Sequence, residues 1–193
     1  MNTKGYHIIL GSGSPRRKEL LGELGFEFEV DTRNTFEEVY SEDTPQESIP
    51  EVLSEGKSLG FHRGLTDKEI LITSDTLVLC EGRVMGKPRD REDAADMLKA
   101  LSGKSHKVIT AVTIRNSERM KTVSDTSLVH FKDLTDSEID HYIDNYRPFD
   151  KAGAYGIQEW IGYIGIDRIE GSYFTIMGLP VHRVYELLLE FIG

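Results

Sequence analysis

The sequence predicts an α/β fold. Strand-like and helix-like patterns alternate along the chain, beginning with the apolar run "YHIIL" and the helical pattern "RRKELLGEL" that follows it. A content of 38% hydrophobic and 29% charged residues is typical of a globular protein with a packed core. No repeat, low-complexity tract or obvious linker divides the chain, so we expect a single domain over residues 1–193.

The first elements are a strand, a helix and a second strand. "YHIIL" is expected to form a buried strand, and Ser14 with Pro15 behind it is typical of a helix start. Gly25 is expected to end this helix. "FEFEV" alternates apolar and acidic residues and predicts a half-buried strand, followed by a polar loop over 32–47.

The second helix is expected to begin near Ser48 and to run to about His62. Ser48 and Glu51 have the spacing of a capping box, in which each residue bonds the other's backbone. "EILITSDTLVLC" then predicts a long strand with polar residues at its centre. "EGRVMGKP" predicts a turn and a short return strand.

The second half continues the alternation. Asp90 is expected to cap a helix that stops at Gly103, and two strands should flank a turn at 116–117. "TDSE" predicts a second capping box and a helix, and "IGYIGIDRI" predicts a strand. Pro180 should open a last amphipathic helix.

The net charge of the chain excludes some classes of binding partner. A net charge of −10 argues against non-specific binding to nucleic acid or an anionic membrane, but not against a small anion held by local cations. One cysteine, Cys80, allows no internal disulfide, and its apolar neighbours predict a core position. With no signal-like or membrane-spanning segment in view, a cytoplasmic setting is expected.

The stretch "GSGSPRRK" after the first strand is a candidate anion site. Free backbone N–H groups and the positive end of a helix favour an anion at such a turn. Arg16 and Arg17 stand in the first helical turn, where the helix dipole disfavours cations unless an anion faces them. The alternative is a polar helix start with solvated arginines. A P-loop is excluded because its G-x-x-x-x-G-K-[ST] pattern is missing.

Three further patterns could carry chemistry. Asp75 in "ITSDTLV" is placed like a metal ligand or general base, although an acid that caps a turn would look the same, and Lys87 could return toward it across the hairpin. Gln158 in "DKAGAYGIQ" could read the edge of a base, or lie in solvent. Paired glutamates near 37–38 could bind a hard cation. Among the histidines, only the role of His106 stays open.

Several of these stretches together resemble the Maf family of nucleoside triphosphate pyrophosphatases. They are "GSGSPRRKELL", "SDTLVLCEGRVMGKPRDREDAADMLKALSGKSHKVITAV", "FKDLTDSEIDHYI", "DKAGAYGIQ" and "IEGSYFTIMGLPVHRVYELL". They occur in family order over nearly the whole chain. The resemblance implies a fold of the Maf/inosine-triphosphatase type: a mixed twisted sheet with flanking helices, and two lobes around a central cleft.

The resemblance also implies an activity. The family hydrolyses a nucleoside triphosphate to the monophosphate and pyrophosphate with a divalent metal cation, here expected to be magnesium, manganese or cobalt. Gln158 within "AYGIQ" resembles the branch that acts on dTTP and UTP, rather than the branch that acts on 7-methyl-GTP. The expected partner is the triphosphate, with a homodimer left open and with neither a nucleic-acid polymer nor a membrane.

The family positions carry over residue by residue. Asp75 matches the catalytic proton acceptor, and "NTFEEVYSE" replaces a shorter family stretch, so the choice of Glu38 over Glu37 as metal ligand stays open. Arg16, Thr76 and Gln158 match positions tied to substrate choice. The expected site is therefore catalytic Asp75, Lys57 and Lys87; substrate-binding Ser12, Arg16, Arg17, Thr76, Lys151 and Gln158; and metal-binding Glu38 and Asp75.

Other functions remain as alternatives. One is a pyrophosphatase for a modified purine triphosphate, such as inosine triphosphate or 7-methyl-GTP. Another is a non-catalytic nucleotide-binding regulator of cell division, which would bind without turnover. A phosphotransferase is disfavoured, because the chain has neither a P-loop nor kinase motifs.

Overall fold

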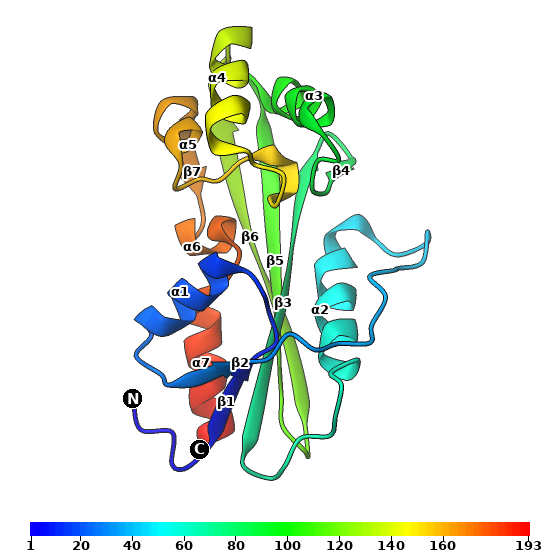
Figure 1. Ribbon diagram of the computed structural model, residues 1–193, viewed down its shortest axis with the longest axis vertical. Helices are drawn as coiled ribbons and strands as arrows, with labels where there is room; N and C mark the ends of the chain where they lie inside the picture. The colour runs from blue at the N-terminus through cyan, green and yellow to red at the C-terminus, as the bar shows by residue number, and fades with distance from the viewer. The chain divides into compact units, whose positions relative to one another are not determined.

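The computed structural model describes residues 1–193 and contains seven α-helices and seven strands (Figure 1). The strands are β1 (His7–Leu10), β2 (Phe28–Val30), β3 (Glu69–Cys80), β4 (Arg83–Met85), β5 (Ser105–Arg115), β6 (Met120–Phe131) and β7 (Ile166–Glu170). The helices are α1 (Pro15–Glu23), α2 (Ile49–Leu59), α3 (Arg91–Leu101), α4 (Asp136–Tyr146), α5 (Trp160–Gly165), α6 (Tyr173–Met177) and α7 (Val181–Ile192), with short 3-10 turns at Gln46–Ser48 and Ala152–Ala154.

The strands form one mixed sheet. Its order is β2-β1-β3-β5-β6-β7, with β4 paired to β3. β1 is parallel to β2 and to β3, whereas β4 and β7 are antiparallel to β3 and β6. The predicted α/β class and the predicted mixed sheet are confirmed.

The chain forms two compact units. Unit 1 comprises residues 1–75, 110–125 and 178–193, and unit 2 comprises residues 76–109 and 126–177. The long strands β3, β5 and β6 each contribute residues to both units.

Unit 1 is built on buried strands with helices on both sides. The residues of β1 from Ile8 to Leu10 are fully covered, which explains why the predicted strand contains only apolar side chains there. α1 and α7 lie on one side of these strands and α2 lies on the other (Figure 1). α7 is amphipathic, as predicted, and buries Val184, Leu187, Leu188 and Phe191 on its inner face.

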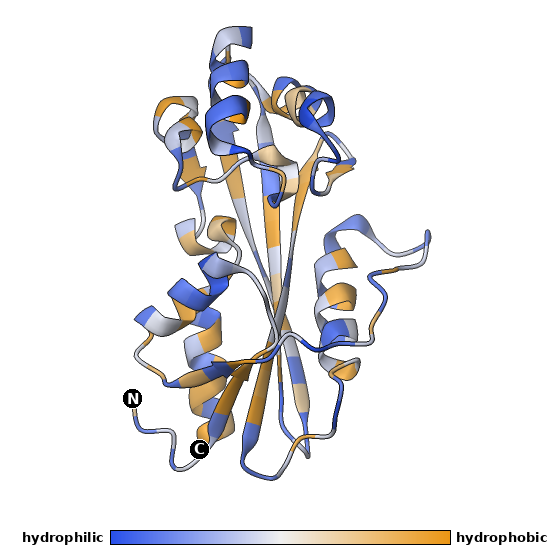
Figure 2. Cartoon of the chain, viewed as in Figure 1, coloured by the Kyte–Doolittle hydropathy of each residue, from blue (hydrophilic) through white to orange (hydrophobic).

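Unit 2 has its own apolar core. The core includes Met85 of β4, Leu98 of α3, Ile139 and Tyr142 of α4, and Ile161 of α5. Figure 2 shows hydrophobic residues along the strands and hydrophilic residues on the outer turns of the helices. Cys80 belongs to this core, which confirms the structural role predicted for it.

Of the two predicted capping boxes, one is confirmed and one is wrong. Thr135 and Glu138 bond each other's backbone at the start of α4. Ser48 lies in a 3-10 turn with helical backbone angles, and its side chain makes no capping bond. Glu51 instead accepts a hydrogen bond from Ser124 Oγ at 2.6 Å, so a tertiary contact replaces the local one.

Other boundaries also differ from the sequence prediction. α2 ends at Leu59 because Phe61 leaves the helix and forms an isolated antiparallel bridge with Asn34. Residues 161–165 of the predicted strand "IGYIGIDRI" belong to α5 (Trp160–Gly165), and the strand β7 begins only at Ile166. No helix in the structure combines the length and apolarity needed to cross a bilayer.

Candidate active site

The turn between β1 and α1 has the predicted helix start. Ser14 is the N-cap of α1, where its hydroxyl accepts from the Arg17 N–H, and Pro15 is the first helical residue. The Gly11 N–H donates to Ile72 O on β3 at 2.8 Å, which fixes the beginning of the turn against the sheet. The N-terminal end of a helix therefore lies at this turn, which favours an anion there.

Arg17 ties this turn to the centre of β3. Its Nη1 donates to Ser74 O at 2.8 Å and to Ser12 Oγ at 3.3 Å, and its Nε donates to Gly178 O at 2.8 Å. Burial lowers the pKa of Arg17, and the neighbouring Asp75 carboxylate opposes this shift. Arg17 thus places a positive charge behind the turn and bonds three protein oxygens.

Arg16 and Asp75 lie in the electrostatic surroundings of Arg17. The positive charge of Arg16 lowers the pKa of Arg17, while the carboxylates of Asp75 and Glu38 raise it. Cations and carboxylates of the predicted site are therefore concentrated in one region of unit 1.

Lys57 lies between two carboxylates. Its ammonium is 2.5 Å from Asp75 Oδ1 and 3.1 Å from Glu38 Oε1. The Lys57 and Asp75 side chains are 17% and 14% exposed, whereas Glu38 is 60% exposed. A mostly buried ion pair with a solvent-facing third member can exchange partners when a charged ligand arrives.

This arrangement fits a divalent cation. Glu38 and Asp75 both reach one point, now occupied by the Lys57 nitrogen, and hard cations prefer such carboxylate oxygens. No group of three or more metal-ligating side chains is present, so protein ligands alone would leave most of the coordination open. Magnesium commonly binds through one or two carboxylates plus water and substrate phosphates. Glu38, rather than Glu37, makes the contact with Lys57.

Hydroxyl and guanidinium groups fix α2 and therefore Lys57. Ser54 Oγ donates to Thr73 O at 3.2 Å, and Thr73 Oγ1 donates back to Ser54 O at 2.8 Å. Arg115 donates from Nη2 to Ser58 O at 2.7 Å. These contacts join residues far apart in sequence, and the sequence analysis did not find them.

The loop that carries Glu38 is packed on the same helix. Asn34 Nδ2 donates to Lys57 O at 2.6 Å, and the Phe36 N–H donates to Asn34 Oδ1 at 2.7 Å. A Cβ on Gly56 would overlap the Phe36 ring. Glycine at position 56 therefore makes room for the Phe36 ring, two residues before Glu38.

Unit 2 holds the other predicted residues. Lys87 is exposed in the segment after β4. The backbone of this segment is bonded to the segment that carries Lys151, because the Gly153 N–H donates to Gly86 O at 3.0 Å. Lys151 is almost fully covered, and its ammonium lies 2.8 Å from Asp150 and 3.1 Å from Glu159.

Gln158 carries an unpaired polar atom. Its Oε1 is buried and accepts no hydrogen bond from the protein. A buried acceptor without a donor costs about 1–3 kcal/mol, which a ligand N–H can recover. Thr76, the other predicted specificity residue of this unit, is half-buried in β3.

His106, whose role the sequence left open, belongs to the core of unit 2. Its ring packs edge-on against Phe131 and Tyr155, and Nε2 lies 2.8 Å from the Tyr155 hydroxyl. Burial lowers the pKa of His106 to about 4. A neutral, enclosed imidazole bonded to a tyrosine is a structural group.

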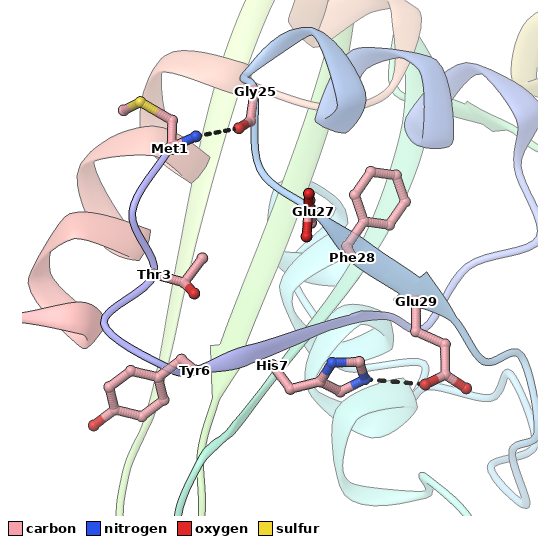
Figure 3. A pocket seen from close by; sticks show the side chains of 8 residues that line it. All are labelled: Met1, Thr3, Tyr6, His7, Gly25, Glu27, Phe28 and Glu29. Carbon is pink, nitrogen blue, oxygen red and sulfur yellow. Dashed lines mark hydrogen bonds and ion pairs between the residues drawn. The ribbon is translucent and has the colours of Figure 1, made fainter.

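A surface pocket of about 510 Å³ lies near the N-terminus (Figure 3), and none of the predicted site residues lines it. Glu27 and Glu29 line it, together with His7, which bonds Glu29 at 3.0 Å. The Met1 amine is bonded to Gly25 O at 2.6 Å. Two carboxylates and no free cation make this pocket a poor site for a phosphate.

The predicted residues are divided between the two units. Within unit 1 these are Ser12, Arg16, Arg17, Glu38, Lys57 and Asp75; within unit 2 they are Thr76, Lys87, Lys151 and Gln158. The boundary between the units falls between Asp75 and Thr76. The sequence analysis missed Tyr142 and Glu159, which bond each other beside Gln158.

Comparison with known proteins extends the likeness to the whole chain. The family model described as Maf-like protein matches residues 7–191. A dTTP/UTP pyrophosphatase of Porphyromonas gingivalis is 48% identical over 192 residues, covering 98% of this chain and 96% of the relative. Proteins of the same name from Christiangramia forsetii and Bacteroides thetaiotaomicron are each 47% identical, over 98% and 95% of this chain and 96% and 95% of their own lengths.

Proposed function

The chain belongs to the Maf-like protein family, and on this basis we propose that it hydrolyses dTTP and UTP to the monophosphate and pyrophosphate. The observation that carries the proposal is the Asp75–Lys57–Glu38 cluster beside an anion-binding turn, in a chain 44–48% identical to proteins of that name. The family also implies a fold of the Maf/inosine-triphosphatase type. We propose that the two compact units are its two lobes and that residues 1–193 act as one domain.

In this proposal unit 1 supplies the phosphate chemistry. A water attacks the α-phosphorus, the bond from that phosphorus to the bridging oxygen breaks, and pyrophosphate leaves. Asp75 accepts the proton of the attacking water, because its carboxylate is held in place by Lys57 and remains partly accessible. Arg16 and Lys57 offset the negative charge of the phosphates, and Ser12 with the backbone N–H groups of the turn adds donors.

A divalent cation completes this set. Glu38 and Asp75 would hold it, and it would supply positive charge to the phosphate oxygens during bond cleavage. The Lys57 ammonium would then release at least one of the two carboxylates and turn to a phosphate. Lys87 and Lys151 of unit 2 are the remaining cations that the family resemblance assigns to the substrate.

Unit 2 supplies recognition of the base. Thymine and uracil present an N–H between two carbonyl groups, and a glutamine amide can pair with that edge because it both donates and accepts. The unpaired Oε1 of Gln158 is the acceptor that the ring N–H would satisfy. Thr76 and Arg16 are the other residues proposed to affect substrate choice.

The experiment that tests the function is a panel of nucleoside triphosphates with pyrophosphate detection, run with magnesium, manganese and cobalt. We expect the highest kcat/KM with dTTP and UTP. A preference for inosine triphosphate or 7-methyl-GTP would assign the chain to a different substrate. Binding of dTTP without turnover under all three metals would support a regulatory role instead.

A further inference from the structure

Gln158 is held in a short turn. The Glu159 N–H donates to Gly156 O at 3.0 Å, which closes a four-residue turn with Gln158 at its third position. The direction of the Gln158 amide therefore depends on how firmly the two ends of this turn are fixed.

One hydroxyl bonds both ends. Tyr142 OH accepts from the Gly156 N–H at 2.9 Å and donates to Glu159 Oε2. Tyr142 lies in α4 and is fully buried, so its hydroxyl has no competing contact with solvent. Burial and the nearby Glu159 carboxylate raise the pKa of Tyr142, which keeps the hydroxyl protonated and able to donate at neutral pH.

The Glu159 carboxylate is fixed from a second direction. Its Oε1 lies 3.1 Å from the Lys151 ammonium, and Lys151 also pairs with Asp150 at 2.8 Å. The Lys151 and Glu159 side chains are 8% and 20% exposed, so solvent weakens this pair little. Both oxygens of Glu159 therefore have a partner, while the neighbouring Gln158 Oε1 has none.

We infer that Tyr142 is a positioning residue: its hydroxyl clamps the Gly156–Glu159 turn and so directs the Gln158 amide toward the base. This inference rests on the proposed role of Gln158 in base recognition. Tyr142 touches no substrate. It acts on Gln158 through one hydrogen bond at each end of the turn, and Gln158 in turn selects the base.

The test compares kcat/KM for dTTP and dCTP. Cytosine lacks the ring N–H from which Gln158 Oε1 is proposed to accept a hydrogen bond. The ratio of the two kcat/KM values therefore reports whether the Gln158 amide points toward the base. Tyr142→Phe should lower the dTTP/dCTP ratio of kcat/KM about tenfold, which corresponds to the loss of the one hydrogen bond between Gln158 and the base. The change should appear as a higher KM for dTTP, with kcat nearly unchanged. Tyr146→Phe is the matched control, because this exposed tyrosine stacks on Tyr142 in the same helix; it should leave the ratio unchanged.

A double-mutant cycle separates positioning from general damage. In a Gln158→Ala background, Tyr142→Phe should cause no further loss of selectivity, whereas unrelated destabilisation would act equally in both backgrounds. Glu159→Gln, which removes the charge shared by Tyr142 and Lys151, should shift the ratio in the same direction and serves if Tyr142→Phe does not fold.

The outcomes distinguish the two levels of the proposal. If Gln158→Ala lowers the ratio while Tyr142→Phe and Glu159→Gln leave it at the wild-type value, the positioning role is wrong and the role of Gln158 stands. If Gln158→Ala has no effect, both roles are overturned. A wild-type protein that does not hydrolyse dTTP would overturn the proposed function itself.

Discussion

Lys57 contacts both carboxylates of the proposed metal site in unit 1. Its ammonium contacts Asp75 and Glu38, while Ser54 and Arg115 fix the helix that carries it. An ammonium between two carboxylates keeps both ionised side chains close together without a metal. The same arrangement allows a cation or a phosphate to replace one of the contacts.

Asp75→Asn tests the chemistry of this cluster. The amide has the size of the carboxylate but cannot accept a proton from water, so we expect turnover of dTTP to fall by ~10³-fold or more. Thermal unfolding should change little, since Lys57 keeps its contact with Glu38. Asp96→Asn, the same substitution at an exposed position of α3, is the control. Near-normal turnover in Asp75→Asn would remove Asp75 from the reaction.

His106 predicts how stability depends on pH. Its pKa is about 4 in the folded protein against an ordinary value of 6.5, so between these values the unfolded chain binds more protons. Lowering the pH through this window therefore destabilises the fold, by about 2 kcal/mol at pH 5 from this group alone. Between pH 7 and pH 5, the free energy of unfolding measured with urea should fall less for His106→Gln than for the wild type. An equal difference in the two proteins would contradict the assignment.

At the scale of elements, α2 and the loop before it act together. The Phe36 ring packs where Gly56 has no side chain, and this contact precedes Glu38 by two residues. The position of a proposed metal ligand thus depends on a glycine in the facing helix.

Gly56→Ala should separate metal binding from stability. The added methyl group must displace the Phe36 ring and with it the Glu38 loop, so we expect manganese affinity to fall about fivefold, equivalent to ~1 kcal/mol. Alanine favours the helix by ~1 kcal/mol relative to glycine, which offsets the cost of displacing the ring, so the free energy of unfolding should change little. Electron paramagnetic resonance of a Mn²⁺ titration measures the first quantity and urea unfolding the second.

Gly22→Ala is the matched control for this variant. Gly22 lies inside α1, and a Cβ there would meet no atom within 4 Å. We expect higher stability and unchanged manganese affinity. Wild-type manganese affinity in Gly56→Ala would show that Glu38 does not depend on this packing.

Local sequence patterns predicted those elements whose start is fixed by nearby residues. Ser14 with Pro15, and Thr135 with Glu138, each satisfy backbone groups within the same helical turn. The pattern failed at Ser48, because the matching Glu51 bonds Ser124 from another part of the chain. Sequence spacing carries no information on such a competing tertiary partner.

The same limit applies to the site. The two sets of charged and polar residues could be predicted because the family motifs mark them in the sequence. Tyr142 could not, since its spacing with Ile139 and Ile143 is that of a buried helix face, and its hydroxyl meets Gly156 only after folding. An acid directly after Gln158 was the one visible signal for this contact.

For the whole molecule, the two units divide the proposed work. Unit 1 contains the proposed metal ligands and the proton acceptor, and unit 2 contains Gln158 and its supporting turn. Substitutions of Glu38, Lys57 or Asp75 should therefore affect kcat for every substrate alike, whereas substitutions around Gln158 should change the order of substrates. The homodimer that the sequence leaves open can be tested by sedimentation analysis.

The most direct test of the account identifies the bond that is cut. The protein is incubated with dTTP and magnesium in water enriched in ¹⁸O, and the products are separated and weighed by mass spectrometry. Attack of water at the α-phosphorus predicts labelled dTMP and unlabelled pyrophosphate in equal amounts, with neither formed by Asp75→Asn. Formation of dTDP and inorganic phosphate, or no turnover with magnesium, manganese or cobalt, would contradict it.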